Sequence, residues 1–210
     1  MTIFEKLASI KIIPVIKIDT VEHAVPLAEA LVAGGLPAAE ITFRSDAAEE
    51  SIRRITEEVP EMLVIAGTVL DPVTADRAVR AGAKAIVSPG LNLETVRWCN
   101  QHGIPVIPGT ATPGELEACM REGLKVVKVF PAEVLGGVAY LKALAGPYAS
   151  MKVMPTGGVK PGNVREYLKQ PNLLCCGGTW IVPGDLLKAG DFKAIEKLAR
   201  EAAEIRDEMA

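Results

Sequence analysis

The 210-residue sequence predicts an α/β protein, a (β/α)8 TIM barrel that forms one domain over residues 1–210 after a short N-terminal helix. Short β-branched runs alternate with helical segments, and no long linker interrupts them. Gly82, Gly103 and Gly123 each end a helical segment just before an apolar run, and their spacing fits one strand-plus-helix unit. A doubly wound open sheet is the competing fold. The number of strands and the lack of a glycine-rich dinucleotide fingerprint after the first strand weigh against it.

The pattern predicts eight strands, at Ile12–Ile18, Ala38–Phe43, Leu63–Val69, Ala85–Ser88, Pro105–Ile107, Val126–Phe130, Lys152–Met154 and Leu173–Cys176. The N-terminal helix places Ile3, Phe4, Leu7 and Ile10 on one side. Later helices are predicted at Thr20–Ala33, Ala47–Glu58, Pro72–Ala81, Leu93–Gln101, Thr112–Arg121, Pro161–Lys169 and Phe192–Glu208. Asp19 or Thr20 could cap the first of these, and Pro26 should kink or delay it.

Composition excludes several classes of function. A net charge of −3 and 4% aromatic residues argue against a nucleic-acid partner. No apolar run is long enough to predict a membrane helix, and the N-terminus lacks a signal-peptide layout. The four cysteines (Cys99, Cys119, Cys175 and Cys176) lack metal-ligand spacing and are interpreted as reduced thiols of a cytoplasmic protein.

The most informative residue is Lys128, which interrupts the apolar strand Val126–Phe130. Burial disfavours the charged form of an ammonium group, and a neutral lysine is a nucleophile that forms a Schiff base with a carbonyl compound. Alternatively, its stem could lie on apolar surface while its head reaches water. Lys17 also interrupts a strand, but Asp19 on the same face offers it a partner. Lys128 is therefore the candidate nucleophile.

Three polar residues share one face of the second strand. Glu40, Thr42 and Arg44 should point to the barrel axis, while Ile41 and Phe43 face the helices. An internal Glu40–Arg44 ion pair is the structural alternative to a functional site. Thr68 ends the third strand, where its hydroxyl could bind substrate. Barrels carry their chemistry at the carboxyl ends of their strands, so these residues are candidates for one site.

Two glycine pairs follow the last strands. Thr156 precedes Gly157-Gly158, and Thr179 follows Gly177-Gly178. Glycine pairs expose backbone N–H groups, and barrels hold phosphate between the loops after strands seven and eight. Tight turns are the simpler explanation for one pair, but two pairs at these positions favour phosphate binding.

A metal mechanism would need a cluster of ligands, which the sequence does not offer. His23 lies in the first helix and His102 at a helix end, both expected away from the catalytic ends of the strands. We therefore expect no metal and no other cofactor.

These segments together resemble the 2-keto-3-deoxy-6-phosphogluconate (KDPG) aldolases, the lysine-dependent aldolases of the Entner–Doudoroff pathway. They often also act on 4-hydroxy-2-oxoglutarate (KHG). The resemblance runs from about Ile12 to the C-terminus. It rests on Glu40-Ile41-Thr42-Phe43-Arg44, Gly67-Thr68-Val69-Leu70, Val87-Ser88-Pro89-Gly90, Lys128-Val129-Phe130-Pro131-Ala132-Glu133, Pro155-Thr156-Gly157-Gly158 and Gly177-Gly178-Thr179-Trp180.

The resemblance implies a role for each candidate. Lys128 would form the Schiff base, Glu40 would be the general acid and base, and Arg44 and Thr68 would bind the carboxylate and keto region. The phosphate of a phosphorylated keto acid would be held by Thr156, Gly157, Gly158, Gly178 and Thr179. Threonine replaces the family's usual serine at position 179 but keeps the hydroxyl. The resemblance also implies a homotrimer.

Two other functions remain open at this stage. A sugar-phosphate isomerase would use Glu40 as its base, with Lys128 acting only through its charge. A binding or assembly module without catalysis would leave polar residues inside the barrel with no benefit to offset their cost. A covalent lysine adduct distinguishes the aldolase from both.

Overall fold

In the computed structural model, which describes residues 1–209, parallel strands alternate with helices. The strands are β1 Ile12–Ile16, β2 Ala38–Thr42, β3 Leu63–Gly67, β4 Ile86–Val87, β5 Val106–Ile107, β6 Gly109–Thr110, β7 Val126–Val129, β8 Lys152–Pro155 and β9 Cys176–Gly178. The helices are α1 Ile3–Ile10, η1 Val21–His23 (a 3-10 turn), α2 Ala24–Ala33, α3 Ala48–Glu58, α4 Pro72–Arg80, α5 Leu93–Gln101, α6 Pro113–Arg121, α7 Gly137–Ala145, α8 Val164–Leu168, α9 Gly184–Ala189 and α10 Phe192–Asp207.

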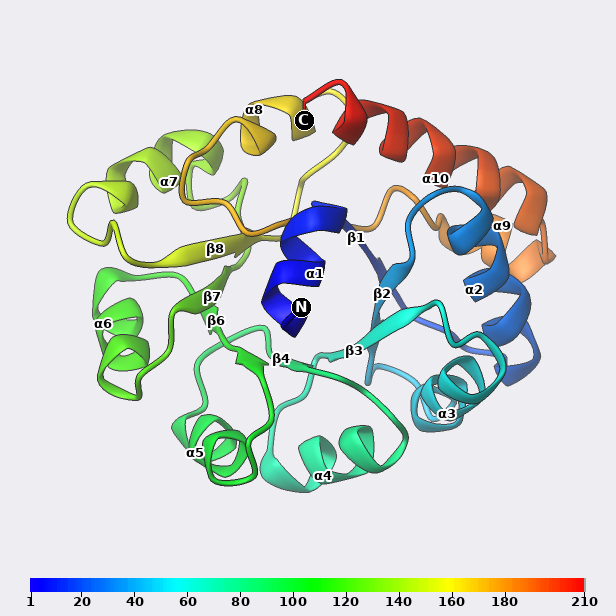
Figure 1. Cartoon of the computed structure of the whole chain (residues 1–210), viewed down its shortest axis with the longest axis horizontal. Helices are drawn as coiled ribbons and strands as arrows, with labels where there is room; N and C mark the ends of the chain where they lie inside the picture. The colour runs from blue at the N-terminus through cyan, green and yellow to red at the C-terminus, as the bar shows by residue number, and fades with distance from the viewer. Residues whose placement is uncertain (210) are drawn as a thin grey trace.

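The strands form two parallel sheets that curl around a common centre, with most helices outside them (Figure 1). One sheet has the order β5-β4-β3-β2-β1-β9, and the other has the order β6-β7-β8. Isolated parallel bridges at Val153–Leu173 and Thr156–Gly177 link β8 to the segment that contains β9. On the other side, β5 and β6 are separated only by Pro108, and they pair with β4 and β7 respectively. Parallel pairing brings the carboxyl ends of all strands to one end of the molecule.

Helix α1 lies across the centre of the strands, at their amino ends (Figure 1). Thr2 and Glu5 form a reciprocal capping box at its start, which satisfies two free backbone N–H groups. Leu7 and Ile10 are buried in the core, and Ile3 and Phe4 pack against it. The amphipathic pattern of the N-terminus therefore predicted this helix correctly.

The last predicted strand was placed too early. Leu173–Cys176 was expected, but the ladder with β1 runs over Cys176–Gly178, so the second glycine pair lies within a strand rather than in a loop. This strand contains glycines because side chains of neighbouring residues fill the space that a Cβ would occupy. A Cβ on Gly177 would lie 2.3 Å from Thr156 Oγ1, and one on Gly178 would lie 1.8 Å from Trp180 Cζ3. Only glycine allows this close approach of strand and side chains.

The first long helix also differs from its prediction. Pro26 delays it, as expected: η1 precedes α2, and Pro26 sits in the first turn of α2, where its missing N–H costs nothing. Capping by Asp19 or Thr20 was wrong, because neither η1 nor α2 has a side-chain cap. The helix predicted at Pro161–Lys169 is limited to Val164–Leu168, and α7 and α9 were not among the predicted helices.

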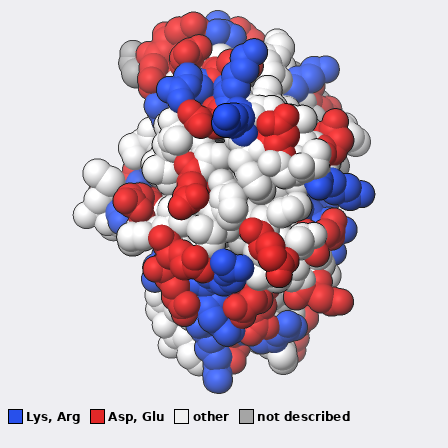
Figure 2. All heavy atoms as spheres, turned by 90° about the vertical axis from the view of Figure 1, so that its right-hand side faces the viewer, with Lys and Arg blue, Asp and Glu red and all other residues white. Residues whose placement is uncertain are grey.

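On the face that includes α10, acidic and basic side chains are interspersed above and below a band that is mostly uncharged (Figure 2). Mixed charge of this kind creates no single-sign field toward a polyanion. None of the helices in residues 1–209 is both long and apolar enough to cross a membrane. All four cysteines are free and buried. Burial raises the pKa of the Cys99 thiol to about 11 and that of Cys119 to about 12.

Candidate active site

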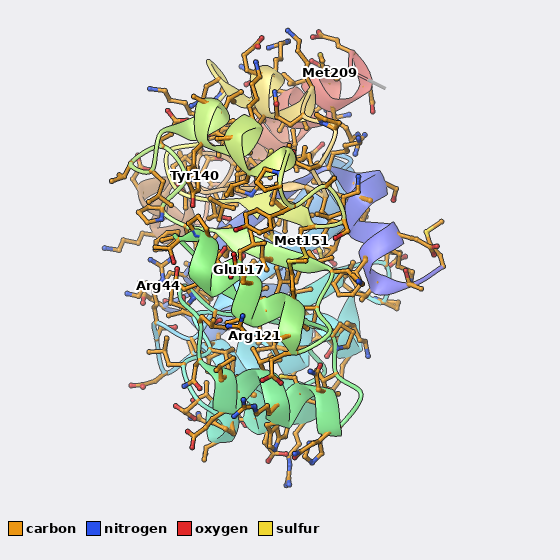
Figure 3. All side chains as sticks on the ribbon, turned by 90° about the vertical axis from the view of Figure 1, so that its left-hand side faces the viewer. Arg44, Glu117, Arg121, Tyr140, Met151 and Met209 are labelled. Atoms are coloured by element: carbon orange, nitrogen blue, oxygen red, sulfur yellow. The ribbon has the colours of Figure 1, made fainter. Side chains whose placement is uncertain are left out.

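The polar residues of β2 and β7 meet at the carboxyl ends of the strands. Arg44, which follows β2, lies at the edge of the molecule opposite α1 (Figure 3). Glu40 and Thr42 come from β2, and Lys128 comes from β7 across the centre. Together with Thr68 and Thr156 they line one cavity of about 230 Å³. These side chains therefore line one cavity, and their roles in a reaction stay a prediction.

Lys128 and Glu40 form a buried ion pair in the lining of this cavity. Lys128 Nζ lies 3.0 Å from Glu40 Oε1 and 3.3 Å from Oε2. The two side chains are only 5% and 1% exposed. Lys128 therefore does not extend its head to water, and the alternative of a surface-seeking lysine is wrong. Glu40 pairs with Lys128, so the alternative of a Glu40–Arg44 pair is wrong as well.

Lys128 is held in place by its position within β7. Lys128 is flanked in register by Gly109 on β6 and Met154 on β8, and the valines on either side of it are fully buried. Its Nζ also lies 5.6 Å from the ring centroid of Phe130, two residues along the same face. An ammonium over an aromatic face gains a favourable electrostatic contact.

The neighbouring strand β3 makes room for Glu40. A Cβ on Gly67 would lie 2.2 Å from Glu40 Oε1 and 2.6 Å from its Cγ, so any side chain at Gly67 would displace the carboxylate. Thr68 follows with φ = 56°, a left-handed conformation that is strained for a β-branched residue. Strain of this kind concentrates at functional sites, and here it turns the threonine into the cavity.

Arg44 is exposed, yet its guanidinium is held at one end. Its Nε donates a hydrogen bond to Thr42 Oγ1 at 3.0 Å, and that hydroxyl donates to the carbonyl of Ile16 at 2.8 Å. Among residues 1–209, no carboxylate forms an ion pair with Arg44. Its positive charge is therefore available to an anionic group of a ligand.

The loop after β8 also lines the cavity. Gly157 and Gly158 have φ values of 98° and 83°, which side chains rarely adopt. Thr156 lines the cavity, while its Oγ1 is buried against Gly177 and has no hydrogen-bond partner among the described residues. Thr179 joins these residues in the cavity lining, whereas Gly178 does not line it and instead packs beneath Trp180.

Several lining residues were not singled out from the sequence. They are Val15, Pro89, Phe130 and Val159, whereas Gly177, which also lines the cavity, belongs to the second predicted glycine pair. Phe130 could have been found, because it shares a strand face with Lys128. Pro89 approaches from the loop after β4, and its place beside the others depends on the curl of the sheet rather than on a local pattern.

The rival candidates lie outside the cavity. Lys17 pairs with Asp19 at 2.7 Å, as predicted, and both side chains are nearly half exposed. His23 follows β1 and so lies nearer the carboxyl ends than expected, but its ring packs edge-on against Phe192 at 5.6 Å. His102 stacks on Trp98. Within residues 1–209, no group of three His, Cys, Asp or Glu side chains is arranged to hold a metal ion.

Comparison with known proteins identifies the family. The family profile described as KDPG and KHG aldolase matches residues 3–198. The chain belongs to this family. A KHG/KDPG aldolase of Escherichia coli K12 is 49% identical over 193 residues, which cover 92% of this chain and 91% of that protein. A 2-dehydro-3-deoxy-phosphogluconate aldolase of Treponema pallidum is 45% identical over 205 residues, which cover 98% of each chain.

Solved structures agree with this assignment. The KDPG aldolase of Legionella pneumophila superposes with a TM-score of 0.91 at 38% identity, over 94% of this chain and 96% of that one. That crystal structure holds pyruvate as a covalent carbinolamine intermediate. The KDPG aldolase of Zymomonas mobilis superposes with a TM-score of 0.90 at 37% identity, over 96% and 95% of the two chains. The protein is accordingly an aldolase, a lyase of carbon–carbon bonds with a TIM-barrel-like α/β fold.

Proposed function

We propose that this aldolase cleaves KDPG to pyruvate and glyceraldehyde 3-phosphate through a Schiff base on Lys128. The observation that carries the proposal is the buried Lys128–Glu40 pair at 3.0 Å, in a cavity that also contains Arg44 and the loop Thr156–Gly158. The carbinolamine in the Legionella pneumophila relative is the intermediate that such a lysine forms with pyruvate. The relative named KHG/KDPG aldolase supports a second substrate, KHG, which would give pyruvate and glyoxylate.

The reaction begins with the ion pair. Transfer of a proton from Lys128 Nζ to Glu40, over the 3.0 Å contact, leaves a neutral amine that attacks the C2 ketone of the substrate. Glu40 then protonates the carbinolamine hydroxyl, which leaves as water and gives a protonated imine. Glu40 is now a carboxylate and therefore a base.

The imine next accepts electrons from the breaking bond. Glu40 takes the proton of the C4 hydroxyl, directly or through water, the C3–C4 bond breaks, and the aldehyde leaves an enamine on Lys128. The same carboxyl group returns its proton to C3 of the enamine. Water then adds to the imine, and hydrolysis releases pyruvate and the amine.

Binding groups surround the reacting atoms. Arg44 would hold the substrate carboxylate. Thr68 would contact the carboxylate and keto region. Thr156, Gly157, Gly158 and Thr179 would hold the phosphate, because all four line the cavity, whereas the expected contact from Gly178 is dropped because that residue lies outside the lining. Contacts distant from the breaking bond orient the substrate for the chemical step.

The proposed architecture is a closed (β/α)8 barrel in one domain. The pairing of β1 with both β2 and β9, and the bridges from β8 to the β9 segment, support closure on one side. The segment Val106–Thr110 supports it on the other, because β5 and β6 count as one strand divided at Pro108.

We infer a homotrimer in the cytoplasm that uses no metal. Leu70 and Val73 are 56% and 72% exposed, and large apolar side chains in contact with water favour self-association. Free, buried cysteines are typical of a reducing compartment. The phosphorylated keto acid is its partner, and neither nucleic acid nor a membrane is expected.

Borohydride reduction in the presence of pyruvate tests the chemistry, with peptide mass spectrometry to locate the adduct. A reduced pyruvate adduct on Lys128 is the expected result. An adduct on Lys17 would keep the reaction and refute the site. A folded protein with no adduct on any lysine would instead favour an isomerase or a binding module.

A further inference from the structure

The hydrogen-bond chain Arg44–Thr42–Ile16 links the cavity to the end of β1. Thr42 is 1% exposed and lines the cavity beside Glu40, yet none of the proposed catalytic or binding steps uses it. Its hydroxyl has one proton, and that proton is donated to the carbonyl of Ile16 at 2.8 Å. The oxygen lone pairs therefore face Arg44, whose Nε–H donates to them at 3.0 Å. The donor and the acceptor of each hydrogen bond are therefore fixed, because the Ile16 carbonyl can only accept and the Arg44 Nε–H can only donate.

Thr42 also holds the backbone of Arg44. The N–H of Arg44 donates to the carbonyl of Thr42 at 2.8 Å, and the N–H of Phe43 donates to the carbonyl of Gly67 at 2.8 Å. The chain thus turns immediately after β2, and the guanidinium is bound to the residue from which it turns. An exposed arginine would otherwise sample many rotamers, and each must be frozen out when a ligand binds.

We propose that Thr42 is a positioning residue that preorganises Arg44 for the substrate carboxylate. With Nε occupied by Thr42, the side-on pair of donors formed by Nε and one Nη is no longer available. The two terminal Nη groups remain, so the carboxylate is bound end-on, in a bidentate contact. This inference rests on the proposed function, in which Arg44 binds the carboxylate of pyruvate and of the keto acid.

The decisive variant is Thr42→Val, which keeps the shape of the side chain and removes the hydroxyl. Borohydride inactivation is measured over a range of pyruvate concentrations, and the concentration that gives half the maximal rate is compared with wild type. We expect it to rise about tenfold, which corresponds to about 1.4 kcal/mol of binding free energy. In turnover, KM should rise while kcat changes little, since carboxylate binding is shared by the ground and transition states. Thr42→Ser should restore both values.

Two controls separate positioning from a general structural defect. Acetaldehyde can form an imine with Lys128 but has no carboxylate, so Thr42→Val should leave its half-saturating concentration unchanged. In an Arg44→Ala background, Thr42→Val should add no further loss of pyruvate affinity. Equal pyruvate affinity of wild type and a folded Thr42→Val would overturn the proposal, as would a similar loss with acetaldehyde or in the Arg44→Ala background. Failure of the aldolase assignment itself is distinct, because wild type would then form no adduct.

Discussion

The Lys128–Glu40 pair should dominate the stability of the site. In Lys128→Met, a side chain of similar length replaces the amine and leaves Glu40 as a carboxylate that is 1% exposed and has lost its partner. Removing one partner of a buried ion pair costs about 3–5 kcal/mol of the free energy of unfolding. Replacing both partners by apolar residues removes both buried charges, so Glu40→Leu/Lys128→Met should lie within about 2 kcal/mol of wild type or above it.

Urea unfolding at one fixed protein concentration measures these differences, because association would otherwise shift the apparent stability. Lys17→Met is the matched control: Lys17 pairs with Asp19 at 2.7 Å, but both side chains are nearly half exposed, so the loss should be about 0–1 kcal/mol.

Two results would contradict this reasoning. Lys128→Met could unfold at the same urea concentration as the Lys17→Met control, which would mean that the carboxylate tolerates burial alone. Alternatively, the double variant could lose as much stability as the two single changes added together, which would mean that the residues act independently. All variants without Lys128 should lack activity, whereas Glu40→Gln should still form the pyruvate adduct, slowly.

Three further outcomes are expected. Gly67→Ala places a Cβ about 2.2 Å from Glu40 Oε1 and should lower kcat at least tenfold. Gly114→Ala is the control, because the space around Gly114 is open, and it should leave kcat unchanged. Equal kcat values for the two variants would refute the role of Gly67. Gly158→Ala forces a side chain into φ = 83° and should raise KM for the phosphorylated substrate without changing pyruvate adduct formation, which borohydride trapping checks. Burial raises the pKa of Cys99 from 9.0 to about 11, so the folded thiol should resist iodoacetamide at pH 8 until urea unfolds the protein. Since the thiol of the unfolded chain ionises at lower pH than the buried thiol, Cys99 should lower the free energy of unfolding as pH rises from 9 to 11. Rapid labelling of Cys99 in the native protein would contradict its burial.

Local sequence patterns predicted the alternation of strands and helices and most of the residues of the candidate site. Apolar runs between glycines are local signals, and Lys128, Glu40 and Arg44 stand out because charged residues are costly in such runs. Strand periodicity then placed Glu40, Thr42 and Arg44 on one face, and all three line the cavity.

Tertiary structure decided which partners these residues have. Glu40 could have paired with Arg44, four residues away, but the curl of the sheet brings Lys128 to it from 88 residues along the chain. The position of β9 and the roles of Gly67, Gly177 and Gly178 likewise depend on side chains from other segments that fill the space of a missing Cβ. Thr42 became informative only when Ile16 and Arg44 were seen on either side of its hydroxyl. Composition and periodicity act over a few residues, whereas these contacts arise from packing between distant strands.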